Sequence, residues 1–173
     1  MTMQVPDTLT LNGRVYEVLA WHGNVESIPS NEKLGINTVS PSTSNHSGRV
    51  DHFGVWGGKL YLFKIEASLK DPEGTPLPEN ARREKLFRYE QMYDFDGSPA
   101  TCREYRYDYF VYEDLTIPYS GSITIQNIID EGWNKPESAP ENFEEETILL
   151  TFDEGVLIDQ SRVSTGKASS CIN

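Results

Sequence analysis

Two short glycine-containing turns constrain this chain more than any other feature of its sequence. The turns are Asn12-Gly13 and Gly57-Gly58, and each separates two segments in which polar and apolar residues alternate. Such a turn needs positive φ angles at both central positions, and alternation with a period of two is typical of a half-buried strand. Each turn therefore predicts an antiparallel β-hairpin. The flanking segments are 8–11, 14–20, 49–56 and 59–67.

Alternation continues in the second half of the chain. The later segments are 102–112, 122–129, 146–152 and 156–160. Short turns between strands favour antiparallel pairing, because parallel strands need long crossover connections that this pattern does not contain. We therefore expect a mainly β fold, an antiparallel β-sandwich or partly closed barrel of about nine strands with at most one short helix.

Segment 81–93 is the one place where the pattern favours a helix. Leu86, Tyr89, Glu90 and Tyr93 follow the three-to-four spacing of a helical face. The aromatic side chains of this segment would suit a strand equally well. We predict a short helix and keep a strand as the alternative.

The alternation within 59–67 also predicts which side chains are buried. One face is apolar throughout, and the other becomes polar toward the end of the segment, so we expect the first face to contact the core. The first face consists of Tyr61, Phe63, Ile65 and Ala67, and the second of Leu60, Leu62, Lys64 and Glu66.

Length and composition favour one domain. With 173 residues, 37% of them hydrophobic, we expect a domain over 1–163 and a flexible polar tail at 164–173. No run of about 18 apolar residues occurs, so we expect no membrane-spanning helix. The first residues lack a secretory pattern, which predicts a cytoplasmic location. Cys102 and Cys171 are expected to be free thiols.

The formal net charge is −12, and it is concentrated late in the chain. From Asp108 to Asp159 there are 13 acidic residues and one basic residue, Lys135. A surface of this sign repels phosphate backbones, so we expect no nucleic-acid binding. The negative charge either keeps the protein soluble or forms a docking face for a basic partner.

No group of residues has the spacing of a catalytic or metal site. His46 and His52 are six positions apart, which matches no common zinc spacing, and Asp51 would point away from His52 in a strand. Segment 94–98 lacks the pattern of a calcium loop, and we predict a turn there. We expect no metal and no cofactor. An enzyme would require His22 or His52 to meet a carboxylate in a cleft.

The leading hypothesis is a non-catalytic protein-binding module, inhibitor- or immunity-like, that docks a basic partner. Tyr105, Tyr107 and Tyr109 share one face of the predicted strand 102–112, next to the acidic part of the chain. Tyrosine is enriched at binding hot spots, and carboxylates attract basic surfaces. The candidate partner-binding residues are Tyr107, Tyr109, Tyr112, Glu113, Asp114, Glu144, Glu145 and Glu146.

The alternative hypothesis is a small-ligand-binding β-barrel or sandwich. Aromatic side chains lining an interior cavity would then bind the ligand. The candidate residues are Trp21, Trp56, Tyr61 and Phe63. The sequence identifies neither a partner nor a ligand, and it predicts no oligomeric state.

Overall fold

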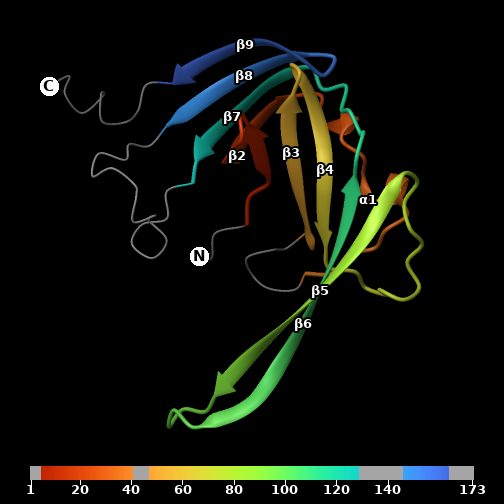
Figure 1. The fold of residues 1–173 in the computed structure, drawn as a ribbon, viewed down its shortest axis with the longest axis vertical. Coiled ribbons are helices and arrows are strands. Elements are labelled where there is room, and N and C mark those ends of the chain that lie inside the picture. Colours follow the sequence, from red (N-terminus) through yellow and green to blue (C-terminus); the bar gives the residue numbers. More distant parts are fainter. Residues whose placement is uncertain (1–4, 41–46, 129–145, 164–173) are drawn as a thin grey trace, which may run out of the picture. The chain divides into compact units, whose positions relative to one another are not determined.

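A computed structural model describes residues 5–40, 47–128 and 146–163 of the chain (Figure 1). Within these residues the chain forms nine strands and one short α-helix, α1 (Asn31–Leu34). The strands are β1 (Thr8–Leu11), β2 (Arg14–Gly23), β3 (Arg49–Trp56), β4 (Lys59–Ala67), β5 (Ala81–Tyr93), β6 (Pro99–Tyr112), β7 (Gly121–Asn127), β8 (Thr147–Asp153) and β9 (Val156–Val163). No helix in the described ranges is long and apolar enough to cross a membrane.

Seven of the strands form a closed barrel. The strand order is β3-β1-β2-β7-β8-β9-β4-β6-β5, and an additional pairing of β3 with β4 closes the ring. The remaining two strands, β5 and β6, continue from β4. This architecture confirms the predicted fold class. One pairing was not expected: β1 lies parallel to β3, which is possible because β2 and the long segment after it form the crossover between them.

Both glycine-containing turns adopt the predicted conformation. Asn12 and Gly13 have φ angles of 52° and 78°, and Gly57 and Gly58 have φ angles of 59° and 73°. Leu11 pairs with Arg14 across the first turn, so the loop contains two residues. The prediction of two tight hairpins is confirmed, because the positive φ angles are a local requirement that glycine and asparagine satisfy.

The helix predicted for 81–93 is wrong, because this segment is strand β5. It pairs with β6 residue by residue, from Ala81 opposite Tyr112 to Gln91 opposite Cys102. This long-range pairing satisfies the backbone and overrides the helical spacing of the side chains. The short helix occurs instead at α1, where the Ser30 side chain accepts a hydrogen bond from the backbone N–H of Lys33.

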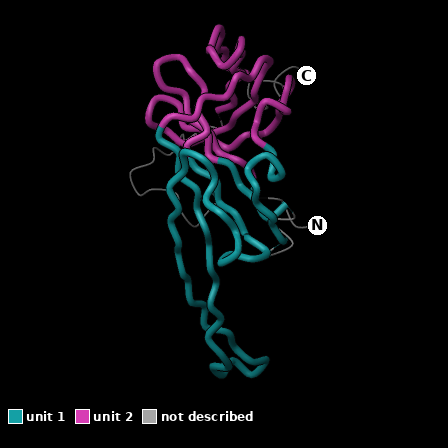
Figure 2. The backbone as a smooth tube through the Cα atoms, turned by 90° about the vertical axis from the view of Figure 1, so that its right-hand side faces the viewer, with its two compact units in different colours: residues 1–5, 30–51, 64–113 teal, residues 6–29, 52–63, 114–173 magenta. Residues whose placement is uncertain are grey.

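Contacts divide the chain into two compact units (Figure 2). Unit 1 comprises residues 1–5, 30–51 and 64–113, and unit 2 comprises residues 6–29, 52–63 and 114–173. Unit 2 therefore contains most of the barrel, and unit 1 contains α1, β5 and β6. The prediction of a single domain over 1–163 stays a prediction, and 164–173 lie outside the described residues.

A β-bulge in β2 determines which side chains enter the core of unit 2. Val18 pairs with Ile125 and Trp21 pairs with Ile123, with a register shift between Val18 and Ala20. The extra residue, Leu19, is exposed, and the shift brings Trp21 onto the same face as Val18. The Trp21 ring then packs edge-on against Phe53 and Tyr119, at centroid distances of 5.0 and 5.2 Å.

The burial pattern of β4 changes phase along the strand. In unit 2, Leu60 and Leu62 are fully buried, whereas in unit 1 the buried residues are Ile65 and Ala67. The predicted core face is therefore correct for Ile65 and Ala67. It is wrong for Tyr61 and Phe63, which are only partly buried. β3 changes phase in the same way, from Val50 in unit 1 to Phe53 and Val55 in unit 2.

The core of unit 1 lies where β3, β4 and the first part of the β5–β6 hairpin meet. Its buried apolar residues include Ile36, Val50, Ile65, Ala67, Leu69, Phe110 and Tyr112. Arg49 links this core to α1. Its guanidinium donates two hydrogen bonds to Asp51, at 2.7 and 3.0 Å, and one to the Asn31 side-chain oxygen at 3.0 Å.

Removing the hydroxyl group from each of two buried tyrosines should change the free energy of unfolding differently. The Tyr119 hydroxyl donates to the carbonyl of Ser122 at 2.8 Å, whereas the buried Tyr112 hydroxyl has no hydrogen-bond partner among the described residues. We expect Tyr119→Phe to lower the free energy of unfolding by about 1 kcal/mol, and Tyr112→Phe to leave it unchanged or raise it by up to about 1 kcal/mol. Urea denaturation measures both values. An equal loss in both variants would contradict this assignment.

Alkaline pH is expected to destabilise the fold through the same residues. Burial raises the pKa of Tyr112 and of Tyr119 above the ordinary value. The unfolded chain therefore loses these protons first, and the stability that is present below about pH 10 declines as the pH rises toward the folded-state values. Urea denaturation between about pH 8 and pH 11 should show this decline, and it should be shallower in Tyr112→Phe. A decline of equal slope in the variant would contradict the contribution of Tyr112.

Candidate protein-binding surface

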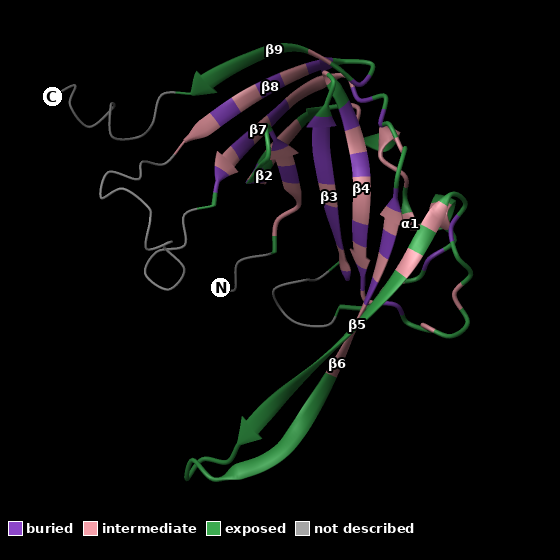
Figure 3. Ribbon diagram, viewed as in Figure 1, coloured by how far each residue is buried: buried purple, intermediate pink, exposed green. Residues whose placement is uncertain are grey.

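The β5–β6 hairpin is the longest exposed element of unit 1 (Figure 3). Its strands contain 13 and 14 residues, but β4 pairs with β6 only through residues 64–67, which lie opposite 108–111. Beyond that region β5 and β6 pair only with each other among the described residues. We call residues 85–107 the distal hairpin. Within the described ranges no third strand pairs with it, and most of its side chains are exposed.

One face of the hairpin carries a row of three tyrosines, as the alternation predicts. Tyr105, Tyr107 and Tyr109 are partly buried and lie opposite Arg88, Leu86 and Glu84 of β5. A cationic group lies over each ring: Lys64 over Tyr109 at 4.3 Å, Arg88 over Tyr107 at 5.7 Å and Arg103 over Tyr105 at 5.2 Å. Burial, followed by the charge of Glu66, raises the pKa of Tyr109. These cation–π contacts hold the ring faces in place of a packed core.

Large apolar side chains are exposed along β5 and at the end of the hairpin. Phe87 is 46% exposed, with the Arg106 guanidinium over its ring at 5.8 Å, and Tyr89 is 69% exposed. The turn that joins β5 to β6 spans 94–98, and Gly97 adopts a φ of 83°. This confirms the turn predicted there. Phe95 in the turn is fully exposed.

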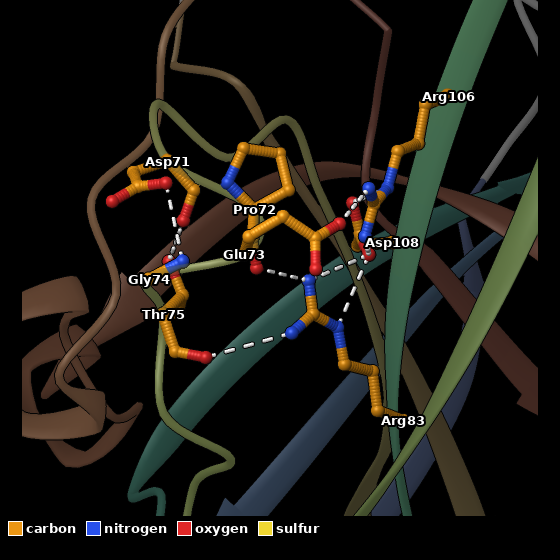
Figure 4. A network of polar contacts seen from close by, with 8 residues as sticks. All are labelled: Asp71, Pro72, Glu73, Gly74, Thr75, Arg83, Arg106 and Asp108. Atoms are coloured by element: carbon orange, nitrogen blue, oxygen red, sulfur yellow. Dashed lines mark hydrogen bonds and ion pairs between the residues drawn. The ribbon is translucent and has the colours of Figure 1, made fainter.

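A buried carboxylate fixes the end of the hairpin that pairs with β4 (Figure 4). Asp108 is 1% exposed, and its Oδ1 accepts hydrogen bonds from Arg83 Nε at 3.1 Å and Nη2 at 2.8 Å. Arg106 Nη2 donates to the same oxygen at 3.3 Å. The sequence predicts that Asp108 belongs to an acidic surface, and this prediction is wrong, because the side chain is buried. Two arginines of unit 1 neutralise it inside the fold.

The same arginines bind the loop before β5, whose residues 71–78 include three prolines. Arg83 Nη2 donates to the carbonyl of Pro72 at 2.7 Å, and Arg106 Nη1 donates to Glu73 Oε1 at 2.6 Å. Within the loop, Asp71 Oδ1 accepts from the backbone N–H of Gly74 at 3.1 Å. The Arg106 guanidinium lowers the pKa of the Glu73 carboxyl. Sequence reasoning missed this network, because its members are far apart in the chain and no local pattern pairs them.

The predicted partner-binding residues are divided between the two units. Tyr107 and Tyr109 lie on the hairpin in unit 1, but Tyr112 is only 5% exposed. Glu113 ends unit 1, and Asp114 begins a segment of unit 2; both are exposed. In unit 2, Glu146 binds Arg14 at 3.4 Å and Arg162 at 3.1 Å. Glu144 and Glu145 lie outside the described residues. The role of this set stays a prediction.

The predicted ligand-binding aromatics do not share one face of the barrel. Trp56 packs against Tyr61 and Phe63, at centroid distances of 5.8 and 5.4 Å, on the face opposite Leu60 and Leu62. Trp21 instead lies among the core rings of unit 2. Nothing in the described residues therefore favours an interior cavity lined by all four. A pocket of about 190 Å³ lies elsewhere in unit 2, beside Lys59 and Glu154, and it is smaller than the roughly 300 Å³ of ordinary ligand sites.

The histidines do not form a recognisable catalytic group in the described part of the chain. His52 Nδ1 lies 2.7 Å from the Thr8 hydroxyl, His22 is exposed, and His46 lies outside the described residues. Residues 5–40, 47–128 and 146–163 contain no group of three potential metal-binding side chains. Neither observation supports a particular reaction.

Comparison of the chain with protein-family models, curated proteins and solved structures finds no match. The geometry and the charges of the described residues are therefore the basis for a functional proposal.

Removing the buried carboxylate is expected to destabilise unit 1. Asp108→Asn leaves Arg83 and Arg106 without their shared anion in a largely buried position, and we expect a loss of about 3 kcal/mol in the free energy of unfolding. The matched control is Glu73→Gln, which removes an exposed carboxylate from the same network and should cost much less. Urea denaturation compares the two. Similar losses in both variants would contradict the anchoring role of Asp108.

Proposed function

We propose that this chain is a non-catalytic protein-binding module whose unit 2 docks a basic protein partner. The observation that carries the proposal is the division of charge between the units. Over the residues that the structure describes, unit 2 contains eight acidic and three basic residues, a net charge of −5, whereas unit 1 contains 13 acidic and ten basic residues, a net charge of −3. We therefore assign the inhibitor-like function expected from the sequence to unit 2.

The acidic side chains of unit 2 are mostly available to a partner where they are described. Asp153 and Glu154, at the turn between β8 and β9, are exposed, as is Asp159 on β9. Two of the three basic residues in the described part of the unit, Arg14 and Arg162, share the single carboxylate of Glu146. Both arginines therefore pair with one carboxylate, and Asp153, Glu154 and Asp159 stay exposed among the residues that the structure describes.

A field of this sign favours a basic partner for a physical reason. Charges on one side of a protein raise the rate of encounter with an oppositely charged surface, and the effect weakens as salt screens it. The β5–β6 hairpin with its turn, residues 81–112, contains by contrast equal numbers of basic and acidic residues. The hairpin therefore adds no net charge to such an encounter.

The test is capture of proteins by the immobilised full chain at two salt concentrations. We expect a basic protein to bind at about 50 mM NaCl and to be released at about 500 mM NaCl. The variant Asp153→Asn, Glu154→Gln, Asp159→Asn should lose at least half of this binding. The matched control, Glu32→Gln, Glu79→Gln, Glu104→Gln, changes the charge of unit 1 by the same amount and should retain it.

Two results would overturn the proposal. One is a captured protein that remains bound at high salt, because a screened interaction must weaken. The other is equal loss of binding in the two triple variants, because the charge of unit 2 would then have no special role.

A further inference from the structure

Strand β5 presents an unpaired edge of regular backbone. It lies at the end of the strand order, so only its β6 side is paired among the described residues. Its regular pairing runs from Ala81 to Gln91, and the register shifts between Gln91 and Tyr93. An edge of this length, without proline, offers a continuous row of backbone donors and acceptors to another strand. The middle residue of the regular span is Leu86.

The distal hairpin also lacks the packing that a stable sheet needs. A two-stranded hairpin is marginally stable in water, whereas three or more strands with an apolar face can be stable. Leu86 is 37% exposed in the single chain, and its neighbours Phe87 and Tyr89 are more exposed still. Strands added next to β5 would give the hairpin more than two strands and would bury part of its exposed apolar side chains.

We propose that β5 pairs with β5 of a second copy of this chain, antiparallel, about a two-fold axis at Leu86. The charges of β5 are complementary in this register. Arg82 lies opposite the partner's Glu90, and Glu84 lies opposite the partner's Arg88, so the symmetric sheet contains four opposite-charge pairs. Opposite charges directly across a sheet stabilise it, and like charges destabilise it.

Neighbouring registers do not have this property. With a two-fold axis perpendicular to the sheet, each β5 residue lies opposite a partner residue whose side chain is on the same face. The axis must therefore pass beside a residue, and the neighbouring registers have it at Lys85 or at Phe87. Moving it to Lys85 puts Arg82 opposite the partner's Arg88. Moving it to Phe87 puts Glu84 opposite the partner's Glu90. The register at Leu86 is also the one that uses the whole regular span from Ala81 to Gln91.

The side chains around the axis are complementary as well. Leu86 would lie opposite the partner's Leu86, and Tyr107 is the β6 neighbour of Leu86 in each copy. The pairing therefore forms a continuous row of two tyrosines and two leucines across four strands. The exposed Arg82–Glu84 pair of the single chain contributes little and can be exchanged for the new pairs.

A charge reversal and its compensation test the register in the full chain. Sedimentation equilibrium of the wild type should show a reversible dimer. Arg88→Glu places like charges opposite each other twice and should weaken dimerisation about tenfold or more. The double variant Glu84→Arg, Arg88→Glu restores the opposite-charge pairs and should recover most of the wild-type affinity. Circular dichroism of each variant checks that the fold is retained.

A crosslink tests the position of the axis independently of affinity. In a Cys102→Ser, Cys171→Ser background, Leu86→Cys places two thiols directly opposite each other, with Cα atoms about 4.5 to 5.5 Å apart, a separation that a disulfide spans. We expect a disulfide-linked dimer after mild oxidation. Gln91→Cys is the control, because its two copies would lie about 33 Å apart and should remain reduced.

Three results would overturn the proposal. They are a wild-type chain that stays monomeric up to about 100 μM, a dimer that Arg88→Glu does not weaken, and crosslinking of Gln91→Cys as readily as of Leu86→Cys. The dimer does not depend on the basic partner. The triple variant of Asp153, Glu154 and Asp159 should dimerise normally, so failure of one proposal leaves the other intact.

Discussion

A two-stranded β-ribbon has no interior, and this constraint governs the structure of unit 1. Strands β5 and β6 extend well beyond the four-residue region where β4 supports them. At the supported end, Asp108 is buried between Arg83 and Arg106, which also bind the preceding loop. At the other end, side-chain contacts between arginines and aromatic rings replace a core. The hairpin is anchored at one end and incomplete at the other, and pairing with a second copy would complete it.

The charges of the two units differ, and so do the partners that we propose for them: a second copy of the chain for unit 1 and a basic protein for unit 2. The hairpin 81–112 has no net charge, but Arg82, Glu84, Arg88 and Glu90 on one face of β5 follow an order of charges that is complementary to the same order reversed. Over its described residues unit 2 has a net charge of −5, and Asp153, Glu154 and Asp159 are exposed there, which favours a basic partner over a copy of itself. The β5 edge of this chain is therefore complementary to itself, whereas the negative charge of unit 2 repels unit 2 of a second copy.

Local signals in the sequence predicted local features well. The positive φ angles at Asn12-Gly13 and Gly57-Gly58 depend on the residues themselves, and the nine-strand β fold followed from such turns and from alternation. Features set by distant contacts were not predicted. The spacing of side chains in β5 predicts a helix, but pairing with β6 makes it a strand. The sequence also predicts an exposed Asp108, but its carboxylate is buried and accepts a hydrogen bond from Arg83. The buried face of β4 changes along the strand, from Leu60 and Leu62 to Ile65 and Ala67, and a strict alternation cannot predict such a change.

Hydrogen–deuterium exchange of the β5 backbone amides tests the central claim most directly, because it reports whether the unpaired edge is completed by another chain. If β5 pairs with a second copy about Leu86, half of the backbone N–H groups between Ala81 and Gln91 gain partners, and their protection should rise with protein concentration while that of the barrel strands stays constant. Protection of β5 that is independent of concentration, from dilute to about 100 μM protein, would contradict the account.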